Sequence, residues 1–248
     1  MRFPRTTARW ALAIVLFLIF VALCPVGIAL ASQAAPGTSN PSQPPLVRGG
    51  VAEVPRDALR YQRDLTRNAR AVWGMDAPVA TFAAQIHQES RWRANAQSPV
   101  GAQGMAQFMP GTATWISGAY KLGEAQPYNT GWALRALVNY DRYLWERVLP
   151  SPQPYPASGR GGERDCSRMA MTLSAYNGGL GWIARDQKLT KAKGGDPLTW
   201  FGHVELFNAG RSAAAFAENR GYPRAILLKH QPIYQAWGGA IDCPGVLI

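Results

Sequence analysis

The chain has 248 residues, which is enough for one sizeable hydrophobic core with short appendages. Its formal net charge of +11 favours anionic partners, such as nucleic acids, anionic lipids or bacterial envelope polymers. No zinc-finger, RRM-type or other nucleic-acid-binding motif is apparent, so a nucleic-acid partner is not predicted.

The first 31 residues have the layout of a secretory signal peptide. Arg2, Arg5 and Arg9 precede an apolar run over residues 11–24, and Ala29-Leu30-Ala31 forms a small-residue cleavage site. We therefore predict a signal peptide over residues 1–31, cleaved after Ala31. The mature protein would be exported to the periplasm or the cell envelope.

Two alternatives to cleavage remain open. The apolar run extended to Leu30 is about long enough to span a bilayer, so the segment could remain as an inner-membrane signal anchor. Lipid attachment at Cys24 is a poorer fit, because Leu23 and Pro25 suit a lipoprotein cleavage box badly. A membrane is a predicted partner only if the segment is uncleaved.

A spacer and a folded domain are expected after the signal segment. Residues 32–55 are rich in Ser, Pro, Gly and Gln, which predicts an unstructured spacer. Residues 56–248 are predicted to form the domain. Its expected helices cover residues 57–72, 77–88, 130–148, 163–176 and 225–237, the last kinked by Pro232. Residues 181–212 are expected to be irregular.

One of these helices carries a carboxylate on its apolar face. The helix over residues 77–88 is expected to be capped by Asp76, and Phe82 and Ile86 fall on one stripe. Glu89 follows Phe82 by seven residues and lies on the same stripe. Because burial disfavours the charged form, we predict that the pKa of Glu89 is raised and that this side chain acts as a general acid.

Export makes the cysteines informative. Once Cys24 is removed, Cys166 and Cys243 remain as a pair in an oxidising compartment. We predict a disulfide that fastens the C-terminal tail to the helix over residues 163–176. The alternative is a pair of free thiols.

Two blocks of residues at fixed spacing surround these features. The first block comprises Glu89-Ser90, Ser98-Pro99-Val100-Gly101-Ala102, Gly104, Gln107, Met109, Pro110 and Thr112, and the second is Ala175-Tyr176-Asn177-Gly178-Gly179. Together they resemble the motifs of the soluble lytic transglycosylase (SLT) domain family, which cuts the glycan strands of peptidoglycan. The family commonly has Gly-Leu-Met-Gln where this chain has Gly104-Met105-Ala106-Gln107, a departure that affects fine packing.

A further segment resembles a third block of the family. Residues 218–222 read Glu-Asn-Arg-Gly-Tyr, similar to the Glu-Thr-Arg-x-Tyr block that precedes the family's last helix. Pro223 stands where valine is usual in the family, so the match that assigns Glu218 and Tyr222 to this block is incomplete.

The resemblance implies a mainly α, lysozyme-like domain of the SLT and goose-lysozyme type, with a substrate groove and little or no β structure. Its partner would be peptidoglycan glycan strands, bound by a monomer. By resemblance, the hydroxyl of Tyr176 hydrogen-bonds to Glu89. The substrate-binding residues implied are Ser98, Gln107, Met109, Tyr176, Asn177, Glu218 and Tyr222.

The chemistry expected at Glu89 uses a single carboxylate. Glycoside hydrolysis ordinarily needs two carboxyl groups, yet residues 90–123 contain no Asp or Glu. The resemblance therefore implies a lytic transglycosylase in which Glu89 acts first as acid and then as base, forming a 1,6-anhydromuramyl end. A lysozyme-like muramidase that uses water and a non-catalytic wall-binding protein are the alternatives.

No metal or cofactor is predicted. His87, His203 and His230 are too scattered in sequence to suggest a ligand set, and His87 is expected to be a surface histidine. General wall remodelling, service to a secretion or conjugation apparatus of the envelope, and a phage role all remain open, as does the choice between internal cuts and cuts at strand ends.

Overall fold

The computed structural model describes residues 53–149 and 162–246. The predicted signal peptide, nearly all of the predicted spacer and the connection at residues 150–161 lie outside the described residues. Among the described residues, we find no helix with the length and apolar character needed to cross a membrane.

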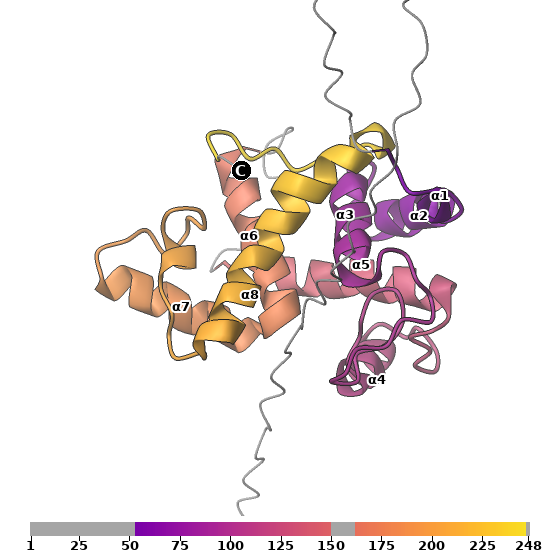
Figure 1. Cartoon of the computed structure of the whole chain (residues 1–248), viewed down its shortest axis with the longest axis horizontal. Helices are drawn as coiled ribbons and strands as arrows, with labels where there is room; N and C mark the ends of the chain where they lie inside the picture. The colour runs from indigo at the N-terminus through magenta and orange to yellow at the C-terminus, as the bar shows by residue number, and fades with distance from the viewer. Residues whose placement is uncertain (1–52, 150–161, 247–248) are drawn as a thin grey trace, which may run out of the picture.

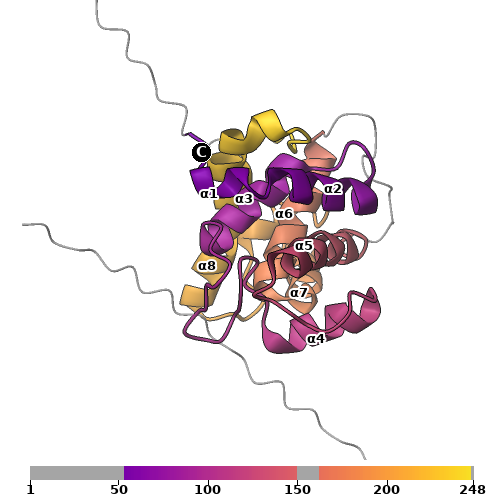
Figure 2. The ribbon, with the colours of Figure 1, turned by 90° about the vertical axis from the view of Figure 1, so that its right-hand side faces the viewer.

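The described chain is helical (Figures 1 and 2). Its α-helices are α1 (Arg56–Leu59), α2 (Gln62–Trp73), α3 (Val79–Ser90), α4 (Pro110–Ala119), α5 (Thr130–Trp145), α6 (Glu163–Gly178), α7 (Leu180–Ala192) and α8 (Ala213–Arg224). The shorter helical segments are the 3-10 helix η1 (Val204–Leu206), the π-helix η2 (Ala225–His230) and the 3-10 helix η3 (Gln231–Trp237). Within the described residues β structure is limited to isolated bridges that pair Gln103 with Gln97 and with Phe108. The predicted mainly α fold is confirmed.

Helix α6 lies at the centre of the domain. Every residue from Asp165 to Ala175 is buried, because α5, α7 and α8 all pack against this helix. Figure 1 shows α8 crossing beside α6, with α7 towards the left of the picture. The second motif block, from Ala175 to Gly179, is therefore held at the end of a largely buried helix.

Helix α3, which ends just after Glu89, packs against α2, η2 and η3. It begins at Val79 with Pro78 as its N-cap, so the predicted capping by Asp76 is wrong. The ψ angle of 66° at Pro78 is outside the helical range, and the preceding residue is disfavoured from helical geometry by the proline ring.

The closing helical segment begins earlier than predicted. Residues 218–222 lie inside α8 instead of before the last helix, and α8 continues through Pro223 into η2 and η3 (Figure 1). Proline has no N–H to donate and its ring crowds the preceding turn, and the chain widens into the π-helical turn of η2 directly afterwards. The side chains of Glu218 and Tyr222 are thus placed one turn apart on a helix.

The region predicted to be irregular, residues 181–212, contains helix α7 instead. Its inward positions are Ile183, Asp186 and Thr190, which follow helical spacing. Two of these three buried side chains are polar, so the apolar periodicity that marks an amphipathic helix is missing from the sequence.

The predicted disulfide between Cys166 and Cys243 is present. It joins the buried start of α6 to the C-terminal tail across a sequence separation of 77 residues. Closing a loop of this length restricts the unfolded chain and contributes about 2–4 kcal/mol to stability. The tail is therefore fastened to the helix that carries the second motif block.

Candidate functional site

Glu89 lies in the last turn of α3 and is partly buried. The hydroxyl of Tyr222, on α8, donates a hydrogen bond to Oε1 of Glu89. The helix ends one residue later because Arg91 adopts a left-handed conformation, with φ 53°. Two elements far apart in sequence thus meet at this carboxyl group.

Burial raises the pKa of Glu89 to about 8. The hydrogen bond from Tyr222 opposes this shift, and the negative charge of Glu218 adds to it. A carboxyl group with such a pKa holds a proton at neutral pH and can give it up to a basic atom. The pKa predicted for Glu89 from its place on the apolar stripe therefore agrees in direction with the structure.

Tyr176 lies near Glu89 but is not its hydrogen-bond partner. Its hydroxyl donates to the carbonyl of Ala106 at 2.7 Å, and its ring contacts those of Tyr140 and Phe108. Burial, and then the charge of Glu89, raise the pKa of Tyr176. The expected hydrogen bond from Tyr176 is thus replaced by the one from Tyr222, because Tyr176 ties α6 to the loop before α4.

Ser98 and Gln107 shape the loop between α3 and α4. The hydroxyl oxygen of Ser98 accepts a hydrogen bond from the Ala102 amide at 2.9 Å, and the Gln107 side-chain amide donates to the Gly104 carbonyl at 2.7 Å. Met109, the N-cap of α4, is 36% exposed. These contacts fix the loop, and within the described residues no hydrogen bond joins Ser98 or Gln107 to Glu89.

Gly104 is the loop position where only glycine fits. Its φ is +73°, and a Cβ there would lie 1.8 Å from the carbonyl oxygen of Pro127. Any side chain would push the loop away from the segment that leads to α5.

Asn177 and Glu218 contact each other. The Asn177 side-chain amide donates to Oε1 of Glu218 at 3.4 Å and accepts from the Asn219 amide at 3.1 Å. A Cβ on Gly178 would lie 2.7 Å from the Asn219 side-chain nitrogen, so this glycine lets α6 and α8 approach. Burial raises the pKa of Glu218. The structure thus joins two of the predicted residues beside Glu89 and Tyr222.

A buried ion-pair cluster, which was not predicted from the sequence, supports the contact between Asn177 and Asn219. Asp186, on α7, is fully buried and accepts hydrogen bonds from Arg211 and, at 2.8 Å, from Arg220. Arg220 also donates to the side chain of Asn219 at 2.6 Å. The chain of contacts therefore runs from Asp186 through Arg220 and Asn219 to Asn177.

A second carboxyl group that was not predicted from the sequence, that of Asp141, interacts electrostatically with Glu89. Asp141, on α5, is fully buried and accepts a hydrogen bond from Gln85 at 3.4 Å. Gln85 precedes Glu89 by one turn of α3. The signal was available in the sequence: Asp141 lies four residues after Leu137 on the apolar stripe of its helix, the same kind of position that singled out Glu89.

His87 is not the surface histidine that was predicted. Its ring is half-buried, stacks on His230 with centroids 4.5 Å apart, and shares a hydrogen bond of 2.9 Å with the Tyr234 hydroxyl. Among the residues that the structure describes, no group of three or more His, Cys, Asp or Glu is placed to hold a metal ion.

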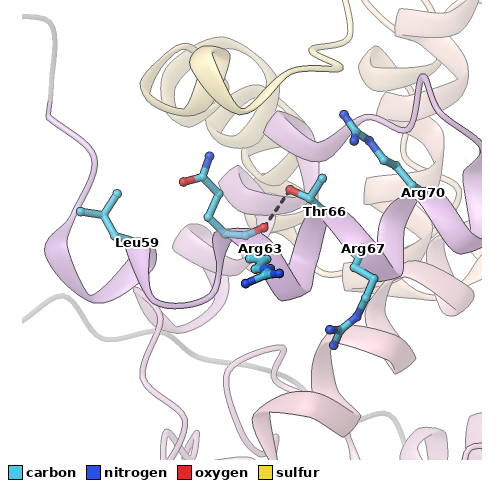
Figure 3. A pocket seen from close by; sticks show the side chains of 6 residues that line it. Leu59, Arg63, Thr66, Arg67 and Arg70 are labelled. Carbon is cyan, nitrogen blue, oxygen red and sulfur yellow. Dashed lines mark hydrogen bonds between the residues drawn. The ribbon is translucent and has the colours of Figure 1, made fainter.

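A shallow pocket of about 430 Å³ lies along the outer face of α2 and the end of α1. Figure 3 shows its lining side chains, Leu59, Gln62, Arg63, Thr66, Arg67 and Arg70. None of the residues grouped around Glu89 contributes to it. The candidate site is therefore the cluster of Glu89, Tyr222, Tyr176, Asn177 and Glu218.

Most of this cluster lies in a part of the chain that matches a known protein family. The sequence model of the family described as "Transglycosylase SLT domain" matches residues 68–198, which is more than half of the chain. The match includes Glu89 and both motif blocks, and ends before α8.

Two curated relatives, both named membrane-bound lytic murein transglycosylase F, are similar to this chain. The protein from Vibrio campbellii is 30% identical over 144 residues, covering 58% of this chain and 24% of the relative. The protein from Mannheimia succiniciproducens is 30% identical over 164 residues, covering 66% and 27%. The chain thus spans about a quarter of the length of these relatives.

A solved structure supports the fold. The crystal structure of the 70 kDa soluble lytic transglycosylase of Escherichia coli superposes with a TM-score of 0.50 at 22% identity, covering 74% of this chain and 25% of that one. The lysozyme-like fold predicted from the resemblance agrees with this similarity.

Proposed function

Because the chain belongs to the Transglycosylase SLT domain family, we propose that it is a peptidoglycan lytic transglycosylase with Glu89 as its single catalytic carboxyl group. The observation that carries the proposal is that burial raises the pKa of Glu89 to about 8, in contact with the Tyr222 hydroxyl. Its substrate would be the β-1,4 bond between N-acetylmuramic acid and N-acetylglucosamine.

In the first step, Glu89 acts as a general acid. Its proton passes to the glycosidic oxygen, the bond from that oxygen to C1 of the muramyl residue breaks, and N-acetylglucosamine leaves with a free 4-hydroxyl. The positive charge that develops at C1 is stabilised by the sugar's own N-acetyl group, which replaces the second carboxylate of ordinary glycosidases.

In the second step, the Glu89 carboxylate acts as a base. It takes the proton of the muramyl 6-hydroxyl while that oxygen bonds to C1, which closes the 1,6-anhydro ring and restores the protonated acid. Tyr222 supports this step, because a hydroxyl that donates to Glu89 stabilises its charged form. No water is consumed overall.

The remaining predicted residues are proposed to bind the glycan around this centre. Asn177 and Glu218 offer amide and carboxyl groups beside Tyr222 for sugar hydroxyl and N-acetyl groups. Met109, which is partly exposed, offers a thioether to a pyranose face. Ser98 and Gln107 keep the loop in place through backbone contacts and retain polar atoms for the substrate.

We also propose that the protein acts in the cell envelope. The signal layout of residues 1–31 supports export, and the names of the curated relatives include membrane-bound proteins of this class. The net charge of +11 suits an anionic wall polymer.

The reaction is tested by digesting purified sacculi with the protein and analysing the products by mass spectrometry. We expect muropeptides that end in 1,6-anhydromuramic acid. Products heavier by one water, with reducing ends, would instead identify a muramidase and contradict the proposed ring closure.

Replacing Tyr222 with phenylalanine tests its part in the reaction. Loss of the hydrogen bond removes the interaction that lowers the pKa of Glu89, so the alkaline limb of kcat/KM should move to higher pH by about one unit. Activity at neutral pH should fall by about tenfold, because the carboxylate of the second step loses a hydrogen bond.

The measurement is kcat/KM across pH for the wild type, Tyr222→Phe and a control, Tyr128→Phe. Tyr128 is 45% exposed and stands outside the site, so its variant should follow the wild-type profile. An alkaline limb in Tyr222→Phe that stays in place or moves to lower pH would contradict the assigned role.

A further inference from the structure

Two buried polar side chains near Glu89, Gln85 and Asp141, each have an oxygen atom without a hydrogen-bond partner. Asp141 and Gln85 are both fully buried, and the Gln85 amide nitrogen donates to Oδ1 of Asp141 at 3.4 Å. The other oxygens, Oδ2 of Asp141 and Oε1 of Gln85, are buried without a hydrogen-bond partner. Two buried acceptors with no donor are costly, because each has lost its hydrogen bonds to water.

One proton satisfies both atoms. A carboxylic acid has an O–H donor as well as an acceptor, and a primary amide has the complementary pair. If Asp141 carries a proton on Oδ2, it can donate to Oε1 of Gln85 while Oδ1 accepts from the Gln85 nitrogen. The acid and the amide then form a reciprocal pair that leaves neither group unsatisfied.

The surroundings favour the neutral form of Asp141. The titratable groups that interact electrostatically with it are acidic: Glu89 on α3, Tyr176 on α6, Tyr222 on α8 and its own neighbour Tyr140. Burial raises the pKa of Asp141 well above its ordinary value, and the charge of Glu89 adds to the shift. The direction agrees with the proton that would satisfy the two unpaired oxygens.

We propose that Asp141 is a neutral carboxylic acid joined to Gln85 in a reciprocal acid–amide pair, and that this pair is the positioning element behind Glu89. Gln85 and Glu89 are one turn apart on α3, so a bond from Gln85 to α5 fixes the turn that carries Glu89. Because the pair is uncharged, Glu89 can become a carboxylate in the second step without facing another negative charge.

The variant Asp141→Asn tests the protonation state independently of any activity. Asparagine imitates the neutral acid, since its amide nitrogen donates where the Asp141 proton would. A carboxyl group whose folded pKa is raised stabilises the fold fully below its unfolded pKa and loses that contribution as pH rises towards the folded pKa. The wild type therefore loses stability above about pH 4 relative to the variant.

The measurement is denaturant unfolding of the wild type and Asp141→Asn at several pH values between about 4 and 7. We expect the ratio of folding constants, variant over wild type, to rise by about tenfold per pH unit until the folded pKa is passed. A ratio that stays flat or falls with pH would show that Asp141 is not held neutral, and would overturn the proposal.

The positioning role rests on the proposed function and is tested by kinetics. Asp141→Asn should keep kcat/KM within about twofold and leave its alkaline limb in place, because the pair remains neutral. Removal of an ionised Asp141 would instead move that limb to lower pH, since the pKa of Glu89 would fall. A shift in that direction would overturn the proposal.

Gln85→Leu supplies the second kinetic variant. Without the amide, the turn that bears Glu89 loses its link to α5, so kcat should fall by about tenfold while KM stays within about twofold. An unchanged kcat, or a change confined to KM, would overturn the positioning role. If no variant and no wild-type sample cleaves peptidoglycan, the proposed function fails, and the unfolding data still decide the acid–amide pair.

Discussion

Replacing Glu89 with glutamine should lower peptidoglycan cleavage by at least about a thousandfold, because one group supplies both proton transfers and each contributes 10²–10⁴ in rate. The fold should survive, since the glutamine carbonyl oxygen can still accept the hydrogen bond from Tyr222. The measurement is the release of soluble muropeptides from sacculi, together with the unfolding midpoint.

The same variant should be at least as stable as the wild type at about pH 8. The pKa of Glu89 is raised to about 8, so the wild type is stabilised by this group below its unfolded pKa and loses that contribution as pH rises through the folded value. Glutamine has no such dependence. Activity lost without loss of stability separates a chemical role from a structural one.

Glu124→Gln is the matched control, because Glu124 is exposed and stands outside the site. It should retain wild-type cleavage. If Glu89→Gln kept more than about a tenth of wild-type activity, the acid–base role of Glu89 would be wrong, and cleavage by the muramidase route through this group would be wrong with it. Absence of cleavage by the wild type itself would favour the wall-binding alternative.

Replacing Asp186 with alanine should destabilise the protein by about 3–5 kcal/mol. The change leaves the buried guanidinium groups of Arg211 and Arg220 without their carboxylate, and an uncompensated buried charge is costly. Arg220 also holds Asn219, which contacts Asn177. We therefore expect a rise in KM as well as the loss of stability.

Asp64→Ala is the control for this prediction. Asp64 pairs with Arg67 on the exposed face of α2, and surface pairs contribute about 0–1 kcal/mol. Chemical unfolding of both variants and the wild type gives the comparison. A loss of less than about 1 kcal/mol in Asp186→Ala would mean that the cluster around α7 does not hold the fold together.

The parts of the fold that could be predicted are those with apolar periodicity or motif spacing. The stripe ending at Glu89 predicted a helix and a raised pKa, and the helix expected over residues 163–176 is present as α6. The disulfide followed from an even number of cysteines in an exported chain. In each case a local pattern carried the information.

The parts that failed depend on contacts between distant segments. Helix α7 was missed because the polar residues Asp186 and Thr190 occupy its inward face. The buried charge of Asp186 is compensated by arginines that lie outside this helix. The Glu89 partner was assigned to Tyr176 by resemblance, whereas α8 brings Tyr222 to that position. The place of Asp141 on an apolar stripe indicated that it is buried, but no local pattern showed that α5 would bring it close enough to interact with the charge of Glu89.

The protonation state of Glu89 is the central claim, and carbon-detected NMR of the side-chain carboxyl groups measures it directly. A titration of the full chain, with Glu89→Gln used to identify the resonance, should give a midpoint of about 8 for Glu89. A midpoint near the ordinary value for glutamate, about 4.3, would show a carboxylate at neutral pH and contradict the account of Glu89 as a proton donor.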